Sequence, residues 1–127
     1  MSVQGHIAHD VVERKLASHR LWLEGAADGQ PASFAHANLF GSDFSGQDLR
    51  EVDFGGADLQ GVRFIGCNLT RAIFAGADLC GASFRDATLE EADLTGTQLV
   101  GAVFEGADLR GVSLRGASGL PSGNGNG

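Results

Sequence analysis

Residues 57–81 read ADLQG VRFIG CNLTR AIFAG ADLCG, which is five blocks of five residues each. The third residue of every block is Leu or Phe, the first is small, and four of the five blocks end in Gly. A period of five fits neither the 3.6-residue period of an α-helix nor the two-residue alternation of a strand. The pattern therefore indicates a repeat architecture with a five-residue unit.

The same frame extends in both directions along the chain. Every fifth residue from position 34 to position 114 is Phe or Leu, which makes 17 consecutive matches, and Gly follows two places later in 12 of them. We expect these large residues to form the core: Phe34, Leu39, Phe44, Leu49, Phe54, Leu59, Phe64, Leu69, Phe74, Leu79, Phe84, Leu89, Leu94, Leu99, Phe104, Leu109 and Leu114.

Three positions of each block explain how such a chain can fold. A large apolar residue and the small residue two places before it point to the same side of an extended segment. The Gly then lets the backbone turn a corner at which other residues would be strained. Four such sides close a square coil of 20 residues, and the coils stack at about 4.8 Å, the spacing of paired strands. Stacking by 20 places Phe-rich walls opposite each other, with two Leu walls between them.

Blocks such as ADLQG, ADLCG and ADLRG at residues 57–61, 77–81 and 107–111 match the motif A(D/N)LxG as they stand. Over about residues 32–117 the chain resembles the pentapeptide-repeat family. The resemblance implies an all-β solenoid, a right-handed quadrilateral β-helix, here of about four coils. Residues 1–31 then form an N-terminal segment, and residues 118–127 form a flexible Gly/Asn-rich tail.

The N-terminal segment has a different pattern. Asp10 and Glu13 have the spacing of a capping box, and apolar residues follow at helical spacing. We expect a helix over about residues 11–24 that covers the apolar end of the solenoid with Leu16, Trp22 and Leu23. The start of the chain, including His6 and His9, is expected to be frayed and to bind no metal.

Composition and charge limit the classes of partner. A formal net charge of −7 argues against nucleic acid and anionic membranes as partners. No apolar run is long enough to span a bilayer, and no signal peptide is visible. The two cysteines have no metal-type spacing and suggest a reducing compartment. We therefore expect a protein of the bacterial cytoplasm that uses no cofactor and no metal.

The sequence contains no phosphate-binding loop and no nucleophile elbow, so an enzyme is not expected. The best indication of function is a set of apolar residues at positions that should face outward. Phe40, Cys80 and Val100 fall in one column of the solenoid, interrupted by Gln60, and Val103 lies round the next corner. An apolar strip on a polar rod is typical of a contact surface.

We therefore expect a binding or scaffold protein with a protein partner. The residues after Leu114 are too poor in apolar side chains to cover the last coil, so a homodimer through the C-terminal coil or through the apolar column is a further expectation.

The alternative is DNA mimicry. Some members of the family resemble duplex DNA and bind DNA gyrase, and their binding protects the gyrase from quinolones. The repeat region has 12 acidic residues and 6 Arg. Its net charge of −6 over about 20 Å is roughly half the charge density of DNA. Those members also tend to have projecting loops and a C-terminal apolar helix, which this sequence lacks.

Overall fold

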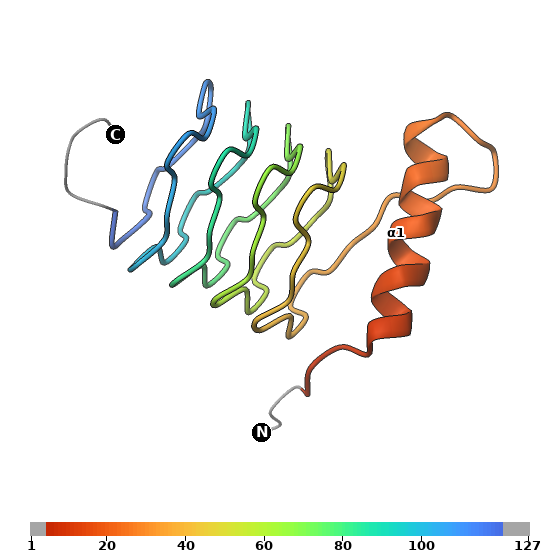
Figure 1. Ribbon diagram of the computed structural model, residues 1–127, viewed down its shortest axis with the longest axis horizontal. Coiled ribbons are helices and arrows are strands. Elements are labelled where there is room, and N and C mark those ends of the chain that lie inside the picture. The colour runs from red at the N-terminus through yellow and green to blue at the C-terminus, as the bar shows by residue number, and fades with distance from the viewer. Residues whose placement is uncertain (1–4, 121–127) are drawn as a thin grey trace.

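The computed structural model describes residues 5–120, which form a rod of stacked coils with one helix at its N-terminal end (Figure 1). Apart from His6 with Asn38, each parallel β-bridge joins residues 20 positions apart, as in the series Ser33, Asp53, Ile73, Asp93 and Ser113. Backbone hydrogen bonds run between coils; for example, the Phe34 N–H donates to the Asp53 carbonyl at 2.7 Å. We name the four walls of the rod after their first large residues: the Phe34, Leu39, Phe44 and Leu49 sides.

The large residues fill the axis of the rod. Fourteen of the 17 are buried, and the three in the last coil, Phe104, Leu109 and Leu114, are half-buried. Phe rings of successive coils stack along the Phe34 and Phe44 sides, and rings of opposite sides meet edge to face. This arrangement fills a narrow core densely, because aromatic pairs favour both geometries.

The corners of the coil have left-handed backbone. Gly occupies most of them, with φ between 65° and 78° at Gly41 to Gly116. Five corners instead have a non-Gly residue, and three of these, Glu51, Arg71 and Glu91, lie in one column. Arg71 joins this column through ion pairs of 3.5 Å with Glu51 and 3.7 Å with Glu91. These ion pairs bring opposite charges together at positions that are conformationally costly for residues other than Gly.

The Asp residues that precede the large residues have a local role. In each case the side-chain Oδ1 accepts a hydrogen bond from the backbone N–H two residues later, as from Gly55 to Asp53 at 2.8 Å and from Thr95 to Asp93 at 2.9 Å. The Asx side chain thus binds an N–H that the coil leaves unpaired. These carboxylates thus stabilise the backbone of their own coil.

The helix α1 extends over His9–Leu23 and begins two residues earlier than we expected. Its N-cap is Ala8, whose carbonyl accepts hydrogen bonds from Val11 and Val12, and no side chain caps it. The expected capping box at Asp10 is therefore wrong, because Asp10 already lies in the first turn. Among residues 5–120 no helix is long and apolar enough to cross a membrane.

The segment before α1 is also paired, contrary to the frayed start that we expected for His6. His6 forms a parallel bridge with Asn38, and the Ile7 N–H donates to the Asn38 carbonyl at 2.9 Å. The His6 ring bonds the Phe40 carbonyl at 3.0 Å. The first coil leaves these carbonyl groups open on its N-terminal edge, and the segment at His6 occupies them.

Helix α1 packs against the N-terminal end of the core through Leu16, which is buried, and Val12, which is half-buried. His19 is fully buried, and its two ring nitrogens bond the Arg50 carbonyl at 2.8 Å and the Ala32 N–H at 2.9 Å. Trp22 and Leu23, which we expected in the same contact, are half-buried and lie outside the core cluster. The polar His19 thus contacts the coil more closely than the neighbouring Trp22.

Candidate functional site

The Leu39 side has a column of outward residues that we call the apolar column: Phe40, Gln60, Cys80 and Val100. Backbone bonds fix their stacking, since Gly41 donates to the Gln60 carbonyl, Gly61 to Cys80 and Gly81 to Val100, at 2.9–3.0 Å. The bridges from Asn38 through Asp58, Asp78 and Gln98 to Ser118 keep the neighbouring column in the same alignment. The structure therefore brings the sequence-predicted Phe40, Cys80 and Val100 into one line along the rod.

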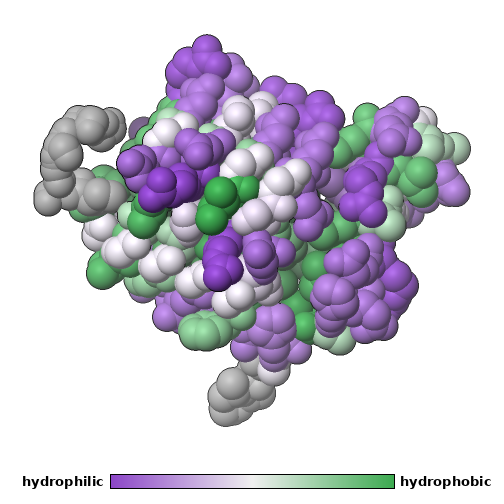
Figure 2. All heavy atoms as spheres, viewed as in Figure 1, coloured by the Kyte–Doolittle hydropathy of each residue, from purple (hydrophilic) through white to green (hydrophobic). Residues whose placement is uncertain are grey.

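Exposure along this column is high for apolar residues. Phe40 is 57% exposed and Val100 64%, while Gln60 and Cys80 are half-buried. Leu120 follows Val100 by 20 residues and is exposed, but within the described residues the Gly101 N–H does not donate to its carbonyl and Gly119 before it has left-handed backbone, so the coil geometry does not continue to Leu120. Figure 2 shows that hydrophilic and near-neutral residues cover most of the visible side of the rod, with hydrophobic residues in separate patches. An aligned apolar column on such a surface is the strongest contact candidate in residues 5–120.

Val103, the fourth residue predicted for this surface, lies in a different column. It pairs with Ser83 on the Phe44 side and is 39% exposed. The Gly101 corner separates it from Val100. Val103 therefore borders the apolar column and belongs to the last coil.

Charge is distributed unequally among the four sides. Ion pairs join Asp43 to Arg63 and Arg85 to Glu105 on the Phe44 side. On the Leu49 side, Arg50 pairs with Asp48, and Arg110 pairs with Asp108 and Glu90.

The Leu39 side lacks such pairs. Its two carboxylates, Asp58 and Asp78, have no salt bridge within the described residues, and no Lys or Arg lies in its blocks. The apolar column is thus flanked by uncompensated negative charge.

The two cysteines differ in environment. Cys67 is buried, its thiol donates to the Phe44 carbonyl at 3.0 Å, and burial raises its pKa. Cys80 lies in the apolar column, where the Asp78 carboxylate beside it raises the thiol pKa and a little burial adds to this. A raised pKa means less thiolate at neutral pH, so Cys80 is not an activated nucleophile.

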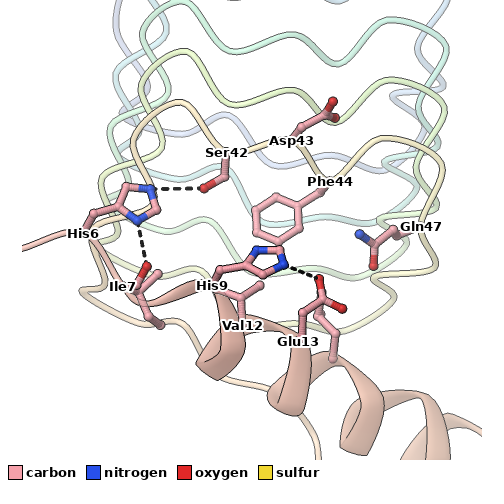
Figure 3. A pocket seen from close by; sticks show the side chains of 10 residues that line it. His6, Ile7, His9, Val12, Glu13, Ser42, Asp43, Phe44 and Gln47 are labelled. Carbon is pink, nitrogen blue, oxygen red and sulfur yellow. Dashed lines mark hydrogen bonds and ion pairs between the residues drawn. The ribbon is translucent and has the colours of Figure 1, made fainter.

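A cleft of about 320 Å³ lies between α1 and the first coil (Figure 3). Phe44 and Val12 form its apolar part, and His6, His9 and Glu13 stand at its margin. His9 pairs with Glu13 at 3.7 Å, and Ser42 lies 3.4 Å from the His6 Nε2. No group of three His, Cys, Asp or Glu residues among residues 5–120 is placed to hold a metal ion. The cleft is the seam of the helix–coil contact.

The parallel 20-residue ladder and the internal Phe stacks define a β-helical solenoid. The model of the pentapeptide repeats family matches residues 30–64, 48–86, 63–97 and 81–118. The chain therefore belongs to the pentapeptide repeat family, whose members fold as right-handed β-helices. Comparison with curated proteins gives no match.

Solved structures of the family are similar to this chain. A pentapeptide repeat protein from the cyanobacterium Cyanothece 51142 is 30% identical, with a TM-score of 0.65 over 68% of this chain and 59% of the other. HetL from Nostoc sp. strain PCC 7120, involved in heterocyst differentiation regulation, is 33% identical, with a TM-score of 0.68 over 72% of this chain and 42% of its own. The matched part thus spans less than two thirds of either relative.

A third similarity is weaker. The full-length plasmid-mediated fluoroquinolone resistance protein QnrB1 is 18% identical, with a TM-score of 0.35 over 71% of this chain and 68% of its own. Similarity at this level carries no information about function.

Proposed function

We propose that this pentapeptide repeat protein is a non-enzymatic binding rod that contacts a partner protein through the apolar column. The observation that carries the proposal is the alignment of exposed Phe40 and Val100 with half-buried Cys80 on one side of the rod. Two exposed apolar side chains three coil levels apart, with Cys80 between them, offer a partner separate anchor points along one line of the rod. Under this proposal the rod has about four coils, and α1 caps its N-terminal end.

The mode of recognition follows from the backbone. Along the Leu39 side the N–H of Leu59 donates to Asp78, and the N–H of Asp78 donates to Ala57, so the backbone there is already paired between coils. A partner cannot add a strand to such a wall and has to bind its side chains. An amphipathic helix lying along the rod suits this surface, because its residues three or four apart are spaced by about 5–6 Å, close to the coil spacing.

The charge beside the column indicates the chemistry of the partner. Asp58 and Asp78 flank the apolar residues and have no cationic neighbour within salt-bridge distance among residues 5–120. A partner segment with apolar residues bordered by Lys or Arg would complement both features. We therefore favour a basic amphipathic helix of another protein as the ligand class.

DNA mimicry is less well supported than side-chain recognition. Five of the six Arg residues in the repeat region form ion pairs with the rod's own carboxylates: Arg50, Arg63, Arg71, Arg85 and Arg110. These pairs mix positive charge into two walls and one corner column, whereas a duplex presents phosphates alone.

Cys80 provides a direct test, because the other thiol, Cys67, is buried. A photoactivatable cross-linker is attached to Cys80 of the folded protein. The cross-links that it forms with proteins of a cell extract are then compared between the parent protein and the Phe40→Asp/Val100→Asp variant. The matched control, Thr70→Asp/Thr88→Asp, adds the same charge on the Leu49 side. We expect a discrete cross-linked protein that competes with a synthetic basic amphipathic helix and is lost only in the Phe40→Asp/Val100→Asp variant.

Equal cross-linking by both double variants would contradict the proposal. A supercoiling assay with DNA gyrase tests the alternative: inhibition at micromolar protein that survives Phe40→Asp/Val100→Asp would favour charge-based mimicry over the apolar column.

A further inference from the structure

The C-terminal coil differs from every earlier coil in its backbone. In earlier coils each side donates and accepts on its C-terminal edge; for example, Phe84 donates to Val103 and Ala82 accepts from Val103. In the last coil the N–H groups of Phe104, Leu109, Leu114 and Gly119 have no partner among residues 5–120. The carbonyls of Ala102, Ala107, Val112 and Ala117 likewise have none. We call this edge the C-terminal rim.

Apolar side chains accompany these open groups. Phe104, Leu109 and Leu114 are half-buried, whereas Phe34, Leu39 and Phe44 of the first coil are buried. The difference arises because α1 and the segment at His6 lie on the first coil, and nothing among the described residues lies on the last one (Figure 1). Within residues 5–120 the rim therefore combines unpaired hydrogen-bonding groups with half-buried core side chains, a combination that favours pairing with another chain.

The pattern of open groups is complementary to itself. On each side of the rim an open carbonyl and an open N–H flank one outward residue, as Ala107 and Leu109 flank Asp108. Two such segments running antiparallel satisfy each other: the carbonyl of one accepts from the N–H of the other, and the reverse. A two-fold axis perpendicular to the rod creates this antiparallel relation on all four sides at once.

The rise of the coil then fixes which sides meet. From Val103 to Ser118 the chain completes three of the four sides of a coil, so the rim rises by about three quarters of a strand spacing. Flat contact therefore requires the high part of one rim to meet the low part of the other. Ser118 of a second copy then lies over Val103, and Ser113 of the second copy lies over Asp108. Ala107 accepts from Leu114 of the second copy, and Leu109 donates to its Val112.

The charges fit this alignment. Arg115 is the one Arg of the repeat region without a salt bridge in the described residues. In the paired rims it lies near Glu105 of the second copy, at the same corner. An alignment that set the Leu49 sides against each other would instead oppose Asp108 to Asp108, and directly opposed like charges destabilise a strand pair.

We propose that the C-terminal rim binds a second copy of this chain, forming a two-fold dimer by antiparallel pairing of the two last coils, with Asp108 opposite Ser113. The inference does not use the apolar column, of which Phe40, Gln60 and Cys80 lie along the rod away from the rim.

Sedimentation velocity of the full chain over a concentration series tests the proposal. We expect a monomer–dimer equilibrium within the range up to roughly 500 µM, well above the dissociation constants of specific complexes. In the two-fold dimer, residue 113 of each copy lies opposite Asp108 of the other copy, so one substitution changes two contacts. Ser113→Glu should raise the dissociation constant about tenfold, whereas Ser113→Lys should lower it by a similar factor. Ser113 is exposed, so neither variant disturbs the core. Ser33→Glu and Ser33→Lys, in the same column at the other end of the rod, serve as controls and should change nothing.

Several results would overturn the inference. A chain that stays monomeric throughout the series, or a dimer indifferent to both Ser113 variants, excludes the rim as the interface. Weakening by Ser113→Lys as well as by Ser113→Glu means that Ser113 faces itself and rejects this alignment. A dimer that appears only after removal of residues 121–127 assigns the rim to the chain's own tail. Loss of the dimer in Phe40→Asp, in the first coil and far from the rim, moves the contact to the apolar column.

Discussion

The rings of Phe54 and Phe74 lie almost parallel in neighbouring coils, with 5.2 Å between their centroids and 7° between their planes. The ring of Phe64, on the opposite side, meets both of them edge to face at 5.5 Å and 5.6 Å. Each central ring therefore contacts aromatic neighbours above, below or across the axis. The core is one continuous stack, and removing a ring opens a space that its neighbours cannot fill by changing rotamer.

Phe74→Ala tests this packing. We expect the free energy of unfolding to fall by about 3–5 kcal/mol, because the substitution removes a fully buried ring and leaves a cavity in a rigid stack. Urea unfolding followed by circular dichroism measures the change. Phe40→Ala removes the same side chain from an exposed position and should change stability by no more than about 0.5 kcal/mol. Equal losses in the two variants would mean that the axial stack contributes no special stability.

His19 provides a second prediction, at the junction of α1 with the coil. Its Nδ1 accepts from the Ala32 N–H, and its Nε2 therefore donates to the Arg50 carbonyl. His19→Leu should lower stability by about 2–4 kcal/mol, because two buried backbone groups lose their partners while apolar volume is kept. Fluorescence of Trp22, whose ring lies 5.4 Å from that of His19, reports the release of α1.

A matched variant separates hydrogen bonding from packing at the same position. His19→Gln retains an amide that can satisfy one of the two backbone groups, so its loss of stability should be smaller than that of His19→Leu. The reverse order would show that the shape of the ring, and not its two hydrogen bonds, holds the helix on the coil.

Much of this fold could be predicted by counting. Four sides of five residues make a coil of 20 residues, so the residues 20 positions before and after Phe54 are its neighbours in the stack. The β-bridges occur at the same interval of 20 residues. The same arithmetic placed Phe40, Cys80 and Val100 in one column. Helix α1 lies outside the repeat, and there local signals were misleading: Asp10 and Glu13 match a capping box, but the helix begins before them.

The contacts that the sequence did not indicate are tertiary. The strand-like pairing of His6 with Asn38 depends on an open coil edge that exists only once the rod has formed. The burial of His19 between Ala32 and Arg50 has the same origin. The repeat period predicts which residues of neighbouring coils pair with each other. It does not predict which segments cover the two ends of the rod.

The corner at Arg71 supports a prediction about backbone strain. Arg71 has φ 60° and two ion pairs on its column, so a single substitution changes both. Arg71→Ala loses the ion pairs but keeps the left-handed backbone, whereas Arg71→Gly loses the ion pairs and relieves that backbone. We expect Arg71→Gly to be more stable than Arg71→Ala by about 1 kcal/mol, measured by chemical unfolding. Identical stabilities would indicate that the corner carries no conformational cost.

Acid should weaken the rod through its hydrogen-bonded carboxylates. Hydrogen bonds from Arg50 and Arg110 hold the pKa values of Asp48 and Asp108 below the ordinary 3.8. The folded state then binds fewer protons than the unfolded state, so this stabilisation is complete above about pH 4 and is lost as pH falls through the folded values. Asp48→Asn/Asp108→Asn should be less stable than the parent at pH 7, with the difference shrinking below pH 4 in thermal melts. A difference that stays constant down to pH 2.5 would contradict the assignment.

The thiol of Cys80 reports on the surface proposed for binding. The neighbouring Asp78 carboxylate raises its pKa, so a disulfide reagent should modify it more slowly at pH 8 than an ordinary exposed cysteine, because only the thiolate reacts. Asp78→Asn removes the charge but keeps an oxygen that can accept the Cys80 N–H, so the backbone bond of 3.1 Å can persist. We expect this variant to react about two- to fivefold faster. Asp93→Asn, on the Phe34 side, should leave the rate unchanged, and Cys80→Ser should react only after denaturant exposes the buried Cys67. An unaltered rate in Asp78→Asn would mean that access, and not the adjacent charge, limits this thiol, and the negative potential that we assign to the Leu39 side would lose its most direct support.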